Sequence, residues 1–316
     1  MNLQPGSARK VSQNRSAVAT FAWFAVIYHI AVILWGAYVR ASHSGAGCGN
    51  HWPLCNGTVL PVAPQLETII EFTHRVTSGL AVFIVLALVV WCWRRTSKGD
   101  WARYSSICSL IFLVNEALLG ALLVALDAGG QGYTPSRVVV LCVHFGNTLL
   151  LLAALTLTAE WLSDSTAQFA VRKEGPSSSG ALSLIAIMIV GMTGALAALG
   201  DTLFPATSLR VSMLQDFSSA GNALQHLRFL HPAAALIGAS FVLWFLLKYG
   251  DKDGQSRMPM IVASILVLQI ALGGFNVLLL APIWLQILHL LVAEVLWIGV
   301  VLVSSRLIMA PRGEAL

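Results

Sequence analysis

Eight apolar runs, most of them at least about 20 residues long, constrain the fold of this chain more than any other feature. Such runs cross a bilayer as α-helices, because a helix satisfies its own backbone hydrogen bonds in lipid. The 316 residues are 57% hydrophobic and 10% charged, against the roughly 25% charge of a soluble domain. The sequence therefore predicts an all-α membrane protein with eight transmembrane helices. We place them at roughly 17–39, 70–93, 104–126, 137–161, 181–200, 229–248, 258–280 and 284–305.

Positive charge predicts the orientation of these helices. An even number of spans puts both termini on one side, and fourteen of the 19 Lys and Arg residues then fall on that side. Because basic loops stay in the cytoplasm, we expect cytoplasmic N- and C-termini in a cell inner membrane. The basic N-terminal segment leads into a retained helix without a small-residue cleavage site, which argues against a signal peptide. These basic loops explain the pI near 9.1. We therefore expect the protein to contact membrane lipid and not to bind nucleic acid.

The chain is predicted to contain two related four-helix bundles, residues 1–162 and 181–316. A polar, Ser-rich linker at 163–180 separates them on the cytoplasmic side. EFTHR before the second run resembles RFLHP before the sixth, NEALLGALLV resembles LQIALGGFNV, and LCVHFGNTLLLL resembles LQILHLLVAEVL. Both halves start on the same side, so the predicted repeats are parallel, related by an axis along the membrane normal.

Four of the eight histidines form the candidate site: His74 and His144 in the first half, His231 and His289 in the second. All four are expected in the outer half of the membrane, on helices that can face each other across a bundle. Two inward histidines on facing helices are the arrangement that holds a haem iron from both sides. A structural zinc site is less favoured, because it needs four nitrogen or sulfur ligands.

Charged residues surround these histidines. Glu71 lies one turn before His74, where it could act as a general acid or base or simply stabilise the helix N-terminus. Arg40, Arg75 and Arg228 are candidates to pair with haem propionates. Glu116 and Glu294 lie within helices, as groups on a proton path or as hydrogen-bonded structural acids.

The loop from Gly36 to Pro61 contains Cys48 and Cys55 on the predicted outer side. An oxidising compartment would allow a disulfide between them, structural or redox-active, and two unpaired thiols are the alternative.

These motifs together resemble the heme A synthase family. The resemblance runs from Gly36 to about Glu294 and rests on VRASHSGAGCGNHWPLCNG, EFTHR, GMTGALAALGDTLFP, LQIALGGFNV and the four histidine helices. It implies oxidation of a ring methyl of haem O to the formyl group of haem A, which supplies terminal oxidases. His74 and His144 would hold the substrate haem, and His231 and His289 a cofactor haem b.

The resemblance further implies that Glu71 is the functionally important acid and that Cys48 and Cys55 form the family's disulfide. The partners it implies are haem O synthase, oxidase assembly factors and an electron donor.

The chain departs from the family pattern at three positions. His43 replaces a small residue, His51 an acid, and Pro232 an arginine after the ligand histidine. Two other functions are compatible with paired histidines, namely a di-haem b-type electron-transfer protein and a haem-carrying membrane chaperone. Charged groups beside the first histidine pair, and fewer beside the second, favour different tasks for the two halves.

Overall fold

Eight long helices dominate the computed structural model, which describes residues 5–127, 134–163, 169–171, 177–219, 221, 223–249 and 257–311. Within these described residues, eight helical segments are long and apolar enough to cross a membrane, as predicted. They are α1 (Pro5–Ala41), α2 (Leu66–Arg95), α3 (Trp101–Asp127), α4 (Pro135–Ser163), α5 (Ser177–Leu203), α7 (Ala223–Leu227) continuing into α8 (Leu230–Tyr249), α9 (Met258–Leu278) and α10 (Ile283–Ile308).

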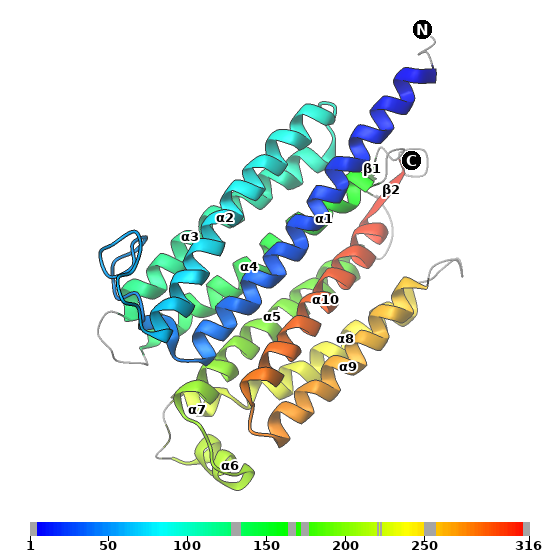
Figure 1. The fold of residues 1–316 in the computed structure, drawn as a ribbon. Helices are drawn as coiled ribbons and strands as arrows, with labels where there is room; N and C mark the ends of the chain where they lie inside the picture. The colour runs from blue at the N-terminus through cyan, green and yellow to red at the C-terminus, as the bar shows by residue number, and fades with distance from the viewer. Residues whose placement is uncertain are drawn as a thin grey trace.

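The ends of the helix array differ in structure (Figure 1). The start of α1 and the end of α10 lie at one end, which we call the terminal end. The opposite end, the loop end, contains η1 (Ser44–Ala46) and the short helix α6 (Leu209–Phe217). The chain therefore returns to its starting side, as an even number of spans requires.

In the part of the chain that the structure describes, two short strands are the exception to the all-helical prediction. β1 (Phe169–Val171) follows α4 and pairs antiparallel with β2 (Met309–Pro311) after α10. This pairing joins the predicted linker to the end of the last helix. Residues 164–168 and 172–176 of that linker lie outside the described residues.

Helix packing forms two rings. In the first, which we call the first bundle, α1 contacts α2, α2 contacts α3, α3 contacts α4, and α4 returns to α1. In the second bundle, α5, α8, α9 and α10 contact one another in the same cyclic order. The division at 162 and 181 and the repeat symmetry stay predictions, and this shared contact order fits them.

The bundles meet through α1 and α4 on one side and α5 and α10 on the other. A direct hydrogen bond crosses this boundary, from the indole N–H of Trp297 to the carbonyl oxygen of Leu149 at 2.8 Å.

Fully buried apolar side chains concentrate in the terminal half of each bundle. Val85, Leu88 and Leu155 form part of the first core, and Val242 and Phe245 part of the second, all without solvent exposure. The four histidines of the candidate site lie towards the loop end of their helices. The dense apolar cores thus fix the helices at one end, and the polar side chains converge at the other.

Candidate functional site

The second bundle brings its two histidines together. The ring centroids of His231 on α8 and His289 on α10 are 6.3 Å apart, and the ring planes are at 81°. The Nδ1 of His231 lies 3.2 Å from the carbonyl oxygen of Val190 on α5. Such a bond fixes the proton on Nδ1 and leaves Nε2 with a lone pair for a metal.

This spacing fits an iron held between two imidazoles. With a metal–nitrogen bond of about 2 Å on each side, and roughly 1 Å from ring nitrogen to ring centre, two axial imidazoles have centroids about 6 Å apart. The observed 6.3 Å therefore agrees with a pair of axial ligands.

Glycines on neighbouring helices make room for three of the four imidazoles. A Cβ on Gly194 of α5 would lie 3.0 Å from Cε1 of His231, and one on Gly273 of α9 would lie 3.2 Å from Cε1 of His289. In the first bundle, a Cβ on Gly36 of α1 would lie 2.9 Å from Cε1 of His74. Each imidazole thus packs against bare backbone, and a larger residue at the glycine would displace it.

The histidines of the first bundle come from α2 and α4, which lie diagonally across the ring. The Nδ1 of His144 lies 3.2 Å from Oε1 of Glu116 on α3. In the second bundle an amide approaches the histidine of the last helix, and it does so at the other ring nitrogen, because Nε2 of Gln269 on α9 lies 3.2 Å from Nε2 of His289.

Glu71 joins α2 to the cysteine loop. Its side chain is buried, and its Oε2 accepts a hydrogen bond from the backbone N–H of Cys48 at 2.7 Å. Arg75 donates to the other carboxylate oxygen through Nη2 at 2.5 Å and Nε at 3.1 Å. The guanidinium of Arg75 also donates to the carbonyl of Leu54 at 2.5 Å. Glu71 and Arg75, both predicted for the site, therefore also hold the cysteine loop over the end of the first bundle.

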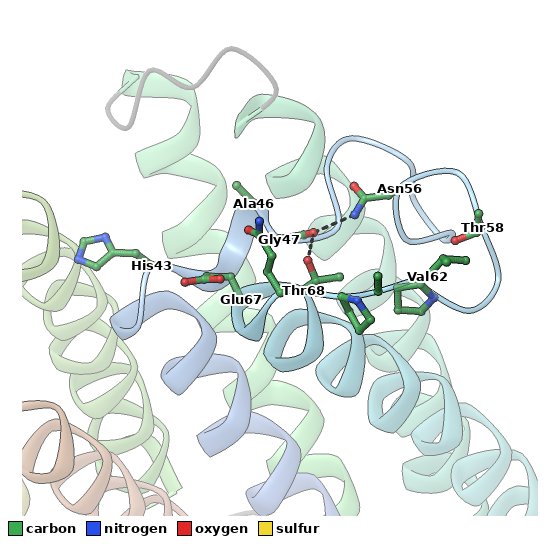
Figure 2. A pocket seen from close by; sticks show the side chains of 12 residues that line it. His43, Ala46, Gly47, Asn56, Thr58, Val62, Glu67 and Thr68 are labelled. Carbon is green, nitrogen blue, oxygen red and sulfur yellow. Dashed lines mark hydrogen bonds between the residues drawn. The ribbon is translucent and has the colours of Figure 1, made fainter.

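The disulfide between Cys48 and Cys55 is present, as the family resemblance implied. Beside it, a cavity of about 550 Å³ lies between the loop and the start of α2 (Figure 2). Asn56 and Thr68 both donate to the Gly47 carbonyl, at 3.1 and 2.8 Å, and so hold the two walls together. The cavity is lined by His43, Ala46, Gly47, Asn56, Thr58, Pro61, Val62, Ala63, Pro64, Gln65, Glu67 and Thr68, and so by none of the four paired histidines.

The other two propionate candidates also have protein partners. The side chain of Arg40 on α1 reaches the second bundle. It donates to the carbonyl of Ala198 at 2.6 Å and to Oε1 of Gln286 at 3.2 Å. Arg228 is buried and forms a 2.6 Å ion pair with Asp216 of α6, as well as a longer one with Asp201. These long-range acceptors follow from no local motif, which is why the sequence did not indicate them.

The remaining polar groups divide into exposed and buried ones. His43 and His51 are exposed in the loop. His29 is buried in α1 and its Nδ1 lies 2.7 Å from the Ala25 carbonyl, as expected for a packing residue. Glu294 is 1% exposed, and neither of its oxygens has a hydrogen-bond partner among the residues that the structure describes. Pro232 lies in the first turn of α8, where proline is tolerated.

Comparison with known proteins gives a family and several relatives. A family model described as "Cytochrome oxidase assembly protein", COX15-CtaA, matches residues 19–301. Proteins named "Protoheme IX farnesyltransferase" in two strains of Thermus thermophilus are each 42% identical over 296 residues, which is 92% of this chain and 48% of theirs. A "Heme A synthase" of Halalkalibacterium halodurans is 38% identical over 128 residues, 40% of each chain. The chain thus spans about half the length of the Thermus relatives.

Proposed function

The chain belongs to the COX15-CtaA family of cytochrome oxidase assembly proteins, and from this premise we propose that it is a haem A synthase. It oxidises a ring methyl of haem O to a formyl group, through successive hydroxylations and loss of water. An external oxidant takes up the electrons removed from the methyl carbon, and the product haem A is supplied to terminal oxidases. Relatives named "Heme A synthase" support this reaction, although each aligns with less than half of the chain.

The observation that carries the proposal is the pair of facing imidazoles in the second bundle. The ring centroids of His231 and His289 are 6.3 Å apart, and the Val190 carbonyl accepts from the Nδ1 of His231. We assign these two residues to a resident haem b, which supplies one-electron transfer when bound.

We assign His74 and His144 to the substrate, haem O. Gly36 gives the His74 ring its space, and Glu71 lies one helical turn before His74. Glu71 is the proposed acid of the reaction. In this arrangement its carboxylate is held by Arg75 and by the Cys48 N–H, so the cysteine loop orients it. A carboxylate that exchanges protons near the substrate is favoured by a fixed orientation.

Propionate binding is proposed for Arg40, Arg75 and Arg228. Their guanidiniums each have more than one donor nitrogen, so an anion could share them with the protein acceptors described above. Because Arg75 lies nearest in sequence to a proposed ligand, it is our first candidate for the substrate site.

The Thermus relatives bear on the supply of the substrate. Their name is not transferred to this chain, since more than half of each lies outside the aligned region. A name that denotes farnesyl transfer to protohaem, on a protein that also matches this chain, favours a haem O synthase as the functional neighbour.

We place the protein in the cell inner membrane, with the terminal end in the cytoplasm and the disulfide outside, because most basic residues then lie in the cytoplasm.

The test is a haem extract. The chain is expressed in membranes that contain haem O but no haem A synthase, and extracted haems are separated by chromatography and identified by mass spectrometry. We expect haem A or its hydroxylated precursor from the unaltered protein, and neither from His74→Ala or Glu71→Ala. His43→Ala, which changes an exposed loop histidine, is the matched control and should retain the product. A folded, haem-loaded protein that makes neither compound when electrons are supplied would exclude the oxidase and favour the di-haem electron-transfer function.

A further inference from the structure

A second carboxylate, Glu116 on α3, lies inside the first bundle. Its Oε1 is 3.2 Å from Nδ1 of His144. Its two oxygens accept hydrogen bonds from the residues one turn after that histidine, Oε2 from the amide of Asn147 at 2.6 Å and Oε1 from the hydroxyl of Thr148. The carboxylate is therefore fixed beside the imidazole by the same helix that carries the histidine.

Glu116 approaches Nδ1 of His144, which is the ring nitrogen that would face away from a metal bound at Nε2. Nδ1 of His144 has no hydrogen-bond partner in the described residues, because its contact with Glu116 has the distance but not the angle of a hydrogen bond. Hydrogen bonds of functional groups are often poorly aligned until the ligand is present. A carboxylate on Nδ1 directs the lone pair of Nε2 towards a metal, and it also increases the basicity of the ligand.

The second bundle provides an internal comparison. When NEALLG is aligned with LQIALG, Glu116 corresponds to Gln269, and each approaches the histidine of the last helix in its own bundle. Gln269, however, contacts Nε2 of His289 rather than Nδ1, and it is an amide. Asn147 and Thr148 correspond to Val292 and Ala293, which have no donors to hold a carboxylate. The sequence thus differs between the bundles at the acid and at both of its hydrogen-bond donors.

We propose that Glu116 is a positioning residue of the first site, whose carboxylate holds the Nδ1–H of His144 and makes this imidazole a stronger electron donor to the substrate haem than either ligand in the second bundle. The inference rests on the proposed function, in which His144 is an iron ligand. A carboxylate within a transmembrane helix is costly to keep in the bilayer and is rarely found there without a function. An amide could bridge two helices without that cost, so a purely structural role does not explain the acid.

The inference predicts that the carboxylate of Glu116 lowers the midpoint potential of haem at the first site relative to a protein without it, because a more basic ligand stabilises ferric iron. The measurement is a redox titration of haem absorbance in purified protein carrying His289→Ala, so that haem at the first site gives the signal. Glu116→Gln, which makes the first bundle resemble the second, should raise the midpoint potential. It should also weaken haem binding by roughly 10- to 100-fold.

Two matched variants identify the cause. Glu67→Gln removes the same charge at an exposed position near the start of α2 and should leave both quantities unchanged. Glu116→Asp keeps the charge but shortens the side chain, so the midpoint potential should stay near that of the parent while haem affinity falls. It also serves as the test should the Gln variant not fold.

The outcomes separate the two proposals. If the parent protein does not oxidise haem O, but Glu116→Gln still raises the midpoint potential, only the proposed reaction is contradicted. A parent protein that binds no haem through His144 would contradict the proposed function itself. An unchanged midpoint potential in folded, haem-loaded Glu116→Gln, or an equal rise in the Asp and Gln variants, would overturn the role of Glu116.

Discussion

Replacing Gly194 by alanine tests the geometry of the second site with a single methyl group. The new Cβ would lie 3.0 Å from Cε1 and 3.3 Å from Nδ1 of His231, whereas ordinary contacts begin at 3.4 Å. The ring must therefore move by about 0.4 Å or more, and its 3.2 Å contact with the Val190 carbonyl limits where it can go. We expect Gly194→Ala to misalign the imidazole rather than unfold the helix.

Gly194→Ala is expected to affect the stability of the haem-free protein and its affinity for haem in opposite directions. Alanine favours a helix over glycine by about 1 kcal/mol, so the stability of the haem-free protein should be maintained or increased. Disturbing the support of a metal-ligating histidine typically reduces affinity by about 10- to 100-fold, or about 1.4 to 2.7 kcal/mol. Weaker haem binding without lower intrinsic stability is the predicted combination.

The assay is a haem b titration of purified protein in a His144→Ala background, followed by absorbance and by the magnetic circular dichroism of bis-imidazole haem. Gly274→Ala is the control, because it introduces the same methyl group on α9 with no atom within 4 Å. The control should bind as the parent does. Parental affinity and an unaltered bis-imidazole spectrum in Gly194→Ala would show that the glycine does not position His231 for haem.

Three further substitutions test other parts of the structure. Replacing both Cys48 and Cys55 by serine should lower the free energy of unfolding by about 2–3 kcal/mol, measured by thermal melting, and melting that is insensitive to reductant in the unaltered protein would contradict this. Glu294→Leu should raise the stability by about 1–3 kcal/mol, because its buried oxygens have no partner among the described residues, and a lower melting temperature would indicate that they do have one. Arg228→Lys should accelerate proteolysis within residues 204–219, because lysine cannot reproduce the several directed donors of the guanidinium, and unchanged cleavage would show that the ion pairs do not hold this segment.

Much of the fold follows from the sequence because a bilayer leaves few alternatives. Long apolar runs predict the helices whatever their neighbours are, and each of the eight predicted spans overlaps an observed membrane-length helix, with ends that differ by a few residues. Matching motifs in the two halves also predicted that His231 would face His289, as it does. Periodicity did not predict α6, whose nine residues include no buried side chain and thus have no core-facing pattern.

The details of the site depend on contacts between distant segments, which no local pattern contains. The acceptors of Arg40 lie 158, 162 and 246 residues away in the chain. Gly36 and Gly194 occur in apolar helices where glycine has several ordinary explanations, and only the structure shows the imidazoles against them. Glu71 was predicted as an acid near the iron, and its proposed catalytic role stays a prediction. Its bond to Cys48 could not be deduced from spacing.

The position of Arg40 has a consequence for biogenesis. Its guanidinium is supplied by α1, while its acceptors belong to α5 and α10, which follow α1 in the chain. Domains generally fold from the N-terminus during synthesis, so this cation enters the membrane before its partners exist. Each hydrogen bond to a charged group contributes about 1.5–3 kcal/mol once formed. Insertion of α10 therefore completes the set of acceptors for Arg40, and a chain truncated before α10 would lack the hydrogen bond that Gln286 accepts.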